Sequence, residues 1–429
     1  MRLKHRPARW ANWPQSVHCS PARVVRPAHE HEIVHIVRQA VADGLTLRVA
    51  GAGHSFAPLV CTDGVLLDIT RLEGCVGIDT AAGTATFWAG TPVRDVNRIL
   101  AADGLALATM GTSRSSTIAG AVITGTHGNC TNAAVMAQHL TAFRLITACG
   151  EILDCSPHSN PDIFGTGRIS LGALGVVTQV TLRCVPAFAL HTARMCHSLS
   201  GFSTLADSIL DQASYASAWW YPDSEHVVLE QAQPVRKLLR KPVSKDIAGD
   251  VVLWAAVTAG RIQPRYTRLA RRPPSGYRSR TLPNSAALTV SQRIPFHALE
   301  YAIPIGELTT VLHTFRAMLQ EEATGMPWPI EIRFSRRDDL PLSLAESRDT
   351  AYLNIVVDPR RRDMSHVLWL AERVLADLDG RPHLAKLHSL DTDEIARCYP
   401  AVEQLDQLRR TIDPSRVFSN PYLERILGW

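Results

Sequence analysis

The chain has 429 residues, of which 46% are hydrophobic and 20% are charged, and its formal net charge is +5. This length exceeds what one hydrophobic core usually supports, so we expect two domains. The balance of apolar and charged residues excludes a disordered or fibrous protein and indicates a globular one. Because no stretch of about 18 consecutive apolar residues occurs, we expect no membrane-spanning helix.

Positive charge is concentrated in one stretch. Residues Arg261 to Arg280 contain seven arginines and no acidic residue. Such a run can bind an acidic partner, but no nucleic-acid-binding motif accompanies it. A solvated surface is the simpler interpretation, and we predict no nucleic-acid partner.

The nine cysteines are odd in number and include no CxxC pair. This pattern favours a reducing compartment over a disulfide framework. The first ten residues carry charge without an apolar segment behind them. We therefore expect a cytoplasmic protein without a bound metal.

The first half of the chain mixes helices with strands. Apolar residues recur at helical spacing from His29 to Ala42, and Gly44 ends the pattern. Thr91 and Pro92 are expected as the N-cap and first residue of a second helix, which ends at Gly104. The predicted strands are Leu45 to Ala50, Val65 to Ile69, Thr84 to Ala89 and Val176 to Val185, and Phe143 to Cys155 is a predicted hairpin that turns at Gly150.

A domain boundary is expected after the strand that ends near Val185. We predict a first domain of residues 1–187 and a second of residues 188–429, whose last part returns to the first domain. The second domain has the predicted strands Trp219 to Tyr221, Glu331 to Phe334 and Ala351 to Val357, and the predicted helix Val367 to Leu378. This mixture predicts an α+β fold.

One glycine-containing segment stands between two predicted strands, and its residues are Gly51, Ala52, Gly53, His54, Ser55 and Phe56. Two close glycines let backbone N–H groups approach an anion. A Rossmann dinucleotide site would require a small residue where Phe56 stands and a long helix after it, so that site is disfavoured. Taken alone, the segment fits a tight turn around a packed histidine equally well.

A second segment, Thr117 to Gly128, consists mostly of small and hydroxyl-bearing residues. Such residues contribute little to a core, but a flat ring or a diphosphate can lie against their backbone. The alternative is a glycine-rich turn. A third small-residue element, Leu171 to Val177, leads into the closing strand and is uninformative by itself.

In the second domain, Glu331 and Arg333 alternate along a predicted strand. Residues two apart in a strand project to the same face, so the two side chains should lie together. They are either a surface ion pair or part of a polar site.

Together these elements resemble the FAD-binding domain of the vanillyl-alcohol oxidase superfamily, and within it the sugar-1,4-lactone oxidases and alditol oxidases. Similar order and spacing extend over nearly all 429 residues. The further matching segments are Glu300 to Pro304, Glu331 to Phe334, Arg348 to Thr350, Gly380 to Lys386 and Asp413 to Asn420.

The resemblance implies a two-domain α+β flavoprotein, in which a PCMH-type FAD-binding domain is covered by an α+β substrate-binding cap. It implies an FAD-dependent oxidase that acts on a sugar-1,4-lactone or a related polyol. A hydride would pass from an alcohol carbon of this small polar substrate to flavin N5, and O₂ would be reduced to H₂O₂.

The resemblance also assigns cofactor-binding residues. His54 is similar to the histidine that, in many family members, bonds covalently to FAD. The other residues expected at the cofactor are Gly51, Ala52, Gly53 and Ser55 at the diphosphate, Thr117, Gly120, Thr124, Gly125, Thr126 and His127 along the flavin and ribityl chain, and Val177 on the adenine side.

Four residues are implied for catalysis. Glu331 would bind or deprotonate the substrate hydroxyl, and Arg333 would stabilise the negative charge that develops on the flavin. Lys386 would supply a positive charge to the substrate oxygen, and Thr117 matches a serine or threonine that also faces substrate.

The chain departs from the family pattern at several positions. The usual His-Trp-Gly-Lys is replaced by His383-Leu384-Ala385-Lys386, which alters the pocket. Asn354 and Val356 stand where alditol oxidases have a histidine and a threonine. These changes favour a lactone ring, or an unusual sugar-derived substrate, over an open-chain alditol.

The resemblance implies an oxidase, because in related enzymes a glycine at the position of Gly125 leaves space for O₂. Three alternatives remain at this point. The enzyme could act on a sugar- or nucleoside-derived intermediate, or it could pass electrons to a quinone or cytochrome. The third is a non-catalytic protein that binds an acidic partner through its basic stretch.

Overall fold

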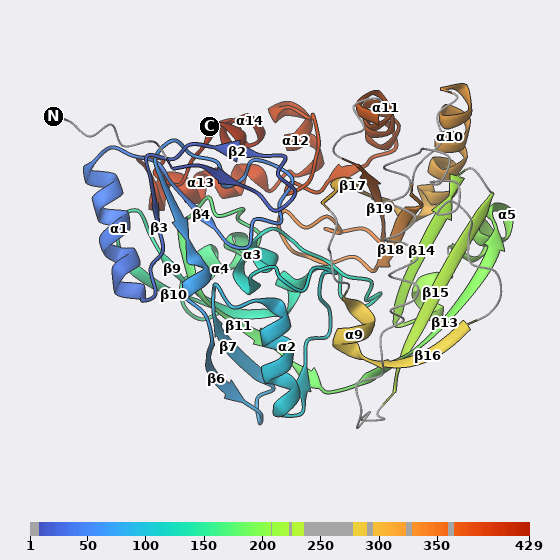
Figure 1. Cartoon of the computed structure of the whole chain (residues 1–429), viewed down its shortest axis with the longest axis horizontal. Coiled ribbons are helices and arrows are strands. Elements are labelled where there is room, and N and C mark those ends of the chain that lie inside the picture. Colours follow the sequence, from blue (N-terminus) through green and yellow to red (C-terminus); the bar gives the residue numbers. More distant parts are fainter. Residues whose placement is uncertain are drawn as a thin grey trace.

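The molecule has two lobes, which Figure 1 shows side by side. The computed structural model describes residues 8–206, 208–222, 225–235, 278–289, 295–322, 328–358 and 364–429. The N-terminal segments, in blue and teal, form the first lobe, and a large sheet in green and orange forms the second. No helix in the described ranges is both long and apolar enough to cross a membrane.

A small parallel sheet lies at one side of the first lobe. Its strands are β3 (Arg23–Val25), β5 (Val65–Asp68) and β4 (Leu47–Ala50), in this spatial order. Parallel strands need a crossover connection, and α1 (Glu30–Ala42) provides it between β3 and β4. Ile33, Val37 and Ala40 are buried on one face of α1, as their helical spacing predicts.

An antiparallel sheet forms the rest of this lobe. In spatial order its strands are β10 (Ile152–Cys155), β9 (Leu140–Ile146), β11 (Val176–Arg183), β7 (Thr84–Trp88) and β6 (Cys75–Asp79). Two short pairs join β1 (Trp10–Ala11) to β2 (His18–Cys19) and β8 (Leu105–Ala106) to β12 (Val185–Pro186). The helices are α2 (Val93–Ala102), α3 (Ile118–Ile123) and α4 (Pro161–Gly167).

The second lobe is built on one mostly antiparallel sheet, which has eight strands within the described residues. In spatial order they are β16 (Arg278–Pro283), β13 (Ala189–Ser198), β15 (His226–Val235), β14 (Tyr215–Tyr221), β18 (Ile330–Ser335), β19 (Thr350–Val357), β17 (His297–Pro304) and β20 (Arg381–Pro382). The helices α5 (Leu199–Ala206), α10 (Leu308–Glu321) and α11 (Met364–Asp377) lie on the side away from the first lobe (Figure 1). Their apolar residues share one core with that face of the sheet.

The end of the described chain returns to the first lobe. The returning part contains α12 (Thr392–Cys398), α13 (Val402–Ile412) and α14 (Pro421–Leu427). Two further short helices, α6 (Ile209–Gln212) and α9 (Asn284–Leu288), occur earlier in the chain. Apolar residues of this part share the core of the first lobe. The backbone N–H of Leu47 in β4 donates to the carbonyl of Val417 at 2.7 Å. The first lobe is therefore assembled from both ends of the sequence.

The expected α+β fold is confirmed, and most predicted elements occur with their ends shifted by a few residues. One cap assignment is wrong, because α2 has Pro92 and not Thr91 as its N-cap. The Thr91 hydroxyl instead donates to the carbonyl of Trp88 at 2.6 Å and accepts from the N–H of Gly74. Most of the basic stretch from residue 261 to 280 lies outside the described residues.

Candidate active site

One cavity of about 500 Å³ lies where the two lobes and the returning segment meet. Almost all the residues selected from the sequence line it. They are Gly51, Ala52, Gly53, His54, Ser55, Thr117, Gly120, Thr124, Thr126, His127, Val177, Glu331, Arg333 and Lys386. Segments far apart in the sequence thus converge on a single site, which is typical of a pocket between domains.

Gly51 and Gly120 form a narrow cradle with Thr117. A Cβ atom at Gly51 would overlap Thr117 Oγ1, and one at Gly120 would lie 2.8 Å from the same oxygen. Thr117 precedes α3 as its N-cap. The sequence did not predict α3, because its six residues include a glycine and are too few for a periodic pattern. This bare backbone fits a cofactor that must approach closely, as the diphosphate and ring of FAD do.

His54 lies on the wall of the cavity, and its imidazole ring is uncharged. Its Nε2 is 2.7 Å from Ser115 Oγ, and its ring lies 5.3 Å from that of Trp13. Burial lowers the pKa of His54 to about 4. The neutral ring keeps a lone pair, which a bond to a carbon atom would require.

Gly125 is the exception among the selected residues, because it does not line the cavity. Its φ is +66°, and a Cβ there would lie 3.4 Å from Ile169 Cγ2. The left-handed backbone conformation is therefore the physical reason for glycine here. An added methyl group would face Ile169 within the first lobe.

A row of side chains crosses four strands of the second lobe and forms the polar wall. Trp219 pairs with Glu331, Glu331 with Asn354, and Asn354 with Glu300, on β14, β18, β19 and β17. Residues paired across strands point to the same face of a sheet. All four side chains therefore reach the cavity.

Glu331 and Arg333 form a two-point ion pair, as their spacing suggested. Arg333 Nε and Nη2 donate to the two oxygens of Glu331 at 3.0 and 2.7 Å. Burial alone would lower the pKa of Arg333, but the charges of Glu331 and Glu300 raise it above its usual value. Asn354 Nδ2 also donates to Glu331, at 3.2 Å.

Glu300 is a site residue to which sequence reasoning gave no role. Its oxygens lie 2.6 Å from His127 Nε2 and 2.7 Å from Lys386 Nζ, and Lys386 also donates to Asn354 Oδ1 at 3.1 Å. The sequence did contain a signal, because Glu300 is the one acidic residue in the apolar run from Ala298 to Ile303. A buried charge is costly unless it is paired, so a glutamate in such a run indicates nearby partners.

The altered segment His383-Leu384-Ala385-Lys386 joins the cavity to the returning chain. Burial lowers the pKa of His383 to about 3, so its ring is neutral. The carbonyl of Ala385 accepts from the N–H groups of Phe56 and Ala57 at 2.8 and 3.3 Å. The segment thus fixes the loop that follows His54.

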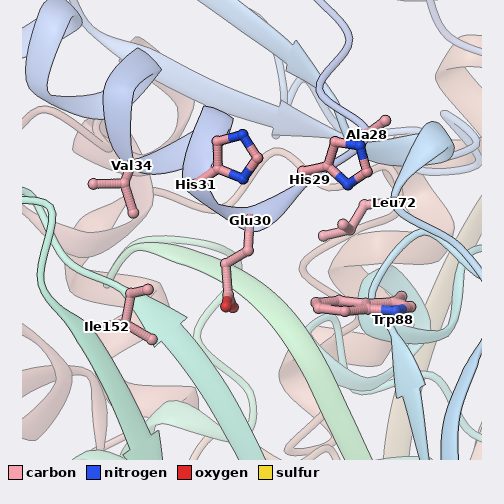
Figure 2. A pocket seen from close by; sticks show the side chains of 8 residues that line it. All are labelled: Ala28, His29, Glu30, His31, Val34, Leu72, Trp88 and Ile152. Carbon is pink, nitrogen blue, oxygen red and sulfur yellow. The ribbon is translucent and has the colours of Figure 1, made fainter.

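A second cavity, of about 440 Å³, lies beside the first turn of α1. Figure 2 shows Glu30 extending between Ile152 and Trp88, with the rings of His29 and His31 at the rim. Glu30 accepts a hydrogen bond from Thr178 at 2.5 Å and pairs with Arg144 at 3.3 Å. The Glu30 carboxylate therefore already has hydrogen-bonding partners within the protein. Among the described side chains, no cluster of three or more histidine, cysteine or acidic residues could hold a metal ion.

The sequence of the chain matches two family models. The model of the FAD binding domain matches residues 21–156, and that of D-arabinono-1,4-lactone oxidase matches residues 180–426. An L-gulono-1,4-lactone dehydrogenase from Mycobacterium tuberculosis is 31% identical over 98% of this chain and 99% of its own length. An L-gulonolactone oxidase from Bos taurus is 30% identical over 97% of this chain and 98% of its own length.

The fold also matches a solved structure. The His121Ala mutant of cholesterol oxidase from Brevibacterium sterolicum has a TM-score of 0.78, with 16% identity over 98% of this chain and 96% of that one. At this identity the likeness concerns the fold alone. The match of the lactone oxidase model to more than half of the sequence, together with relatives similar along their whole length, places this chain in the D-arabinono-1,4-lactone oxidase family of FAD-dependent oxidoreductases.

Proposed function

We propose that the protein is an FAD-dependent oxidase of a sugar-1,4-lactone or a related cyclic polyol, which yields H₂O₂. The observation that carries this proposal is the position of Glu331, Arg333 and Lys386 in the same cavity as the cradle of Gly51, Gly120 and Thr117. Relatives of about 30% identity are named as lactone oxidases or dehydrogenases. Bound FAD would accept a hydride at N5 and return the electrons to O₂.

The residues of the polar wall would act on the hydroxyl that is oxidised. Glu331 is the acceptor for its proton, and the ion pair with Arg333 fixes the orientation of this carboxylate. The Lys386 ammonium would hold an oxygen of the substrate beside Asn354. The positive charges of Arg333 and Lys386 would favour negative charge that develops during the reaction.

The lining of the cavity supports a compact ring as substrate. Val356 and Asn354 replace the polar pair expected of alditol oxidases, and Val356 lines the cavity without a hydrogen-bonding group. Trp219 and Phe296 add aromatic surface on which the C–H groups of a sugar ring could pack. An open-chain polyol would leave more of its hydroxyls without partners.

The first test uses L-gulono-1,4-lactone and D-arabinono-1,4-lactone. Mixing either with the purified yellow enzyme without air should bleach the visible flavin absorbance, and admitting air should restore it with formation of H₂O₂. A flavin that no sugar lactone or cyclic polyol reduces would contradict the proposed substrate class.

A second candidate is the same oxidation with a quinone or cytochrome as acceptor. The M. tuberculosis relative is named a dehydrogenase, which favours it, and Gly125 does not face the cavity. Lactone-dependent dye reduction without oxygen consumption would establish this candidate in place of the oxidase.

We also propose that FAD is bound covalently through His54, which is neutral and lines the cavity. Acid precipitation should leave the yellow colour in the pellet of the native protein and in the supernatant of His54→Ala. Colour in the native supernatant would remove the covalent link but keep the flavoenzyme. The free state of all nine cysteines is in keeping with a reducing compartment, and we propose a cytoplasmic location.

A further inference from the structure

A buried cluster of charges joins three parts of the chain at the edge of the cavity. Glu300 is 1% exposed and His127 is 2% exposed. His127 belongs to the first lobe, Glu300 to β17 of the second lobe, and Lys386 to the returning segment. Glu300 contacts the other two at 2.6 and 2.7 Å.

Both hydrogen-bond partners of the His127 ring, the Gly128 carbonyl and the Glu300 carboxylate, are oxygen atoms. Nδ1 lies 3.2 Å from the carbonyl oxygen of Gly128, which can only accept, so Nδ1 carries a hydrogen. Burial would raise the pKa of Glu300, but the charge of Lys386, whose Nζ lies 2.7 Å away, outweighs this and the pKa lies well below its usual range. The carboxylate is therefore ionised and needs a donor at Nε2 as well.

The surroundings fit a doubly protonated ring. His127 stacks on Tyr352, with ring centroids 3.8 Å apart and an interplanar angle of 17°. The other ionisable groups that face Glu300 are Lys386, Arg333 and the neutral His383. An imidazolium can interact favourably with the face of the Tyr352 ring, which burial keeps in its neutral form by raising its pKa.

We propose that Glu300 is a positioning residue, which holds His127 as an imidazolium and fixes the Lys386 ammonium beside the substrate position. Within this cluster and the adjoining ion pair, His127, Lys386 and Arg333 against Glu300 and Glu331 leave one positive charge in excess. A fixed excess of this sign favours the negative charge that a hydride brings to a flavin. The catalytic consequence rests on the proposed function, whereas the protonation of His127 does not.

The test is nitrogen-15 NMR of the resting holoenzyme with labelled histidine, near pH 7 and without substrate. The signals of His127, assigned with the variant His127→Asn, should show a proton on both ring nitrogens. In Glu300→Gln, which keeps the shape and removes the charge, only one nitrogen should be protonated. Reduction of the flavin by substrate should become slower by about tenfold or more, as expected for one lost charge interaction.

Glu372→Gln is the matched control. Glu372 is also buried in the second lobe, where it accepts from Tyr301 Oη at 2.5 Å and from Ser389, but it does not line the cavity. This variant should leave the His127 signals and the reduction rate unchanged, even if its melting temperature falls.

A wild-type His127 with a single ring proton, or His127 signals that are identical in Glu300→Gln, would overturn the proposal. If Glu300→Gln does not fold, the wild-type spectrum still decides the protonation. A protein that oxidises no lactone but shows the doubly protonated ring would refute the proposed function and leave this assignment standing.

Discussion

Gly51 shows how a single missing side chain shapes the cofactor site. Thr117 Oγ1 occupies the space that a Cβ of Gly51 would need, and the same oxygen lies 2.8 Å from the Cβ position of Gly120. Both glycines line the cavity. The two glycines therefore let their segments pack closely around Thr117 at the wall of the cavity.

We expect Gly51→Ala to retain much less FAD than the wild type, because the methyl group must displace Thr117 from the cradle. Overpacking of this kind costs about 1 to 3 kcal/mol. The ratio of flavin to protein absorbance after purification measures the effect. Gly165→Ala is the control, since its Cβ would meet no atom within 4 Å. Equal flavin content in the two variants would show that the cradle is not needed.

Contacts within one strand could be predicted from the sequence, and contacts between distant segments could not. The alternation of Glu331 and Arg333 was enough to predict that they share a face, because strand geometry is local. The partners of Glu300 could not be predicted, since His127 and Lys386 are 173 and 86 residues away. Gly125 was chosen by resemblance, and its backbone conformation becomes evident only in the structure.

The helix α14 couples the end of the described chain to the loop that borders the cavity. Asn420 is the N-cap of α14, and its Oδ1 accepts from the N–H of Leu423 at 2.9 Å. Its Nδ2 lies within 2.9 to 3.2 Å of the carbonyls of Pro58, Leu59 and Cys61. One amide thus caps a helix and holds a loop.

The variants Asn420→Ala and Asn420→Asp separate the capping of α14 from the binding of the loop carbonyls. The aspartate keeps the cap, which is worth about 1 kcal/mol, but replaces the donor by a carboxylate facing carbonyl oxygens. We expect both variants to lose FAD more readily than the wild type, and the aspartate variant to be the less stable. Urea unfolding and flavin release measure the two effects. An aspartate variant as stable as the wild type would show that the loop does not depend on Asn420.

Elements with a clear local signal were predicted, and those that depend on the tertiary fold were not. The spacing of apolar residues indicated α1 and α11, and β-branched residues indicated β11. The strand β17 carries a buried glutamate in its middle, and it pairs with β19 over its full length. Such a strand is recognised only when its partners are known.

For the whole molecule, buried neutral histidines make stability depend on pH. Burial lowers the pKa of both His383 and His388 to about 3, from an ordinary value of 6.5. The unfolded chain binds a proton at each below about pH 6.5, while the folded protein does not. Their contribution to stability is therefore full above that pH and is lost as the pH falls towards 3.

At pH 5 we expect each of these histidines to have removed about 2 kcal/mol from the free energy of unfolding. Urea denaturation at pH 7 and at pH 5 measures the loss. His388→Gln, which has no ring to protonate, should lose less stability over this interval than the wild type. An equal loss in both proteins would mean that His388 is protonated in the folded state.

The return of the chain to the first lobe sets an order of events during synthesis. Arg48, next to the residue that pairs with Val417, donates to the carbonyl of Phe418, and Phe56 pairs with Ala385. A ribosome makes these partners several hundred residues after β4, so the nascent chain cannot complete the wall of the cavity while the second lobe is being made. Flavin incorporation should therefore be a late, post-translational event, and ribosome-bound chains that lack residues 413–429 should carry none.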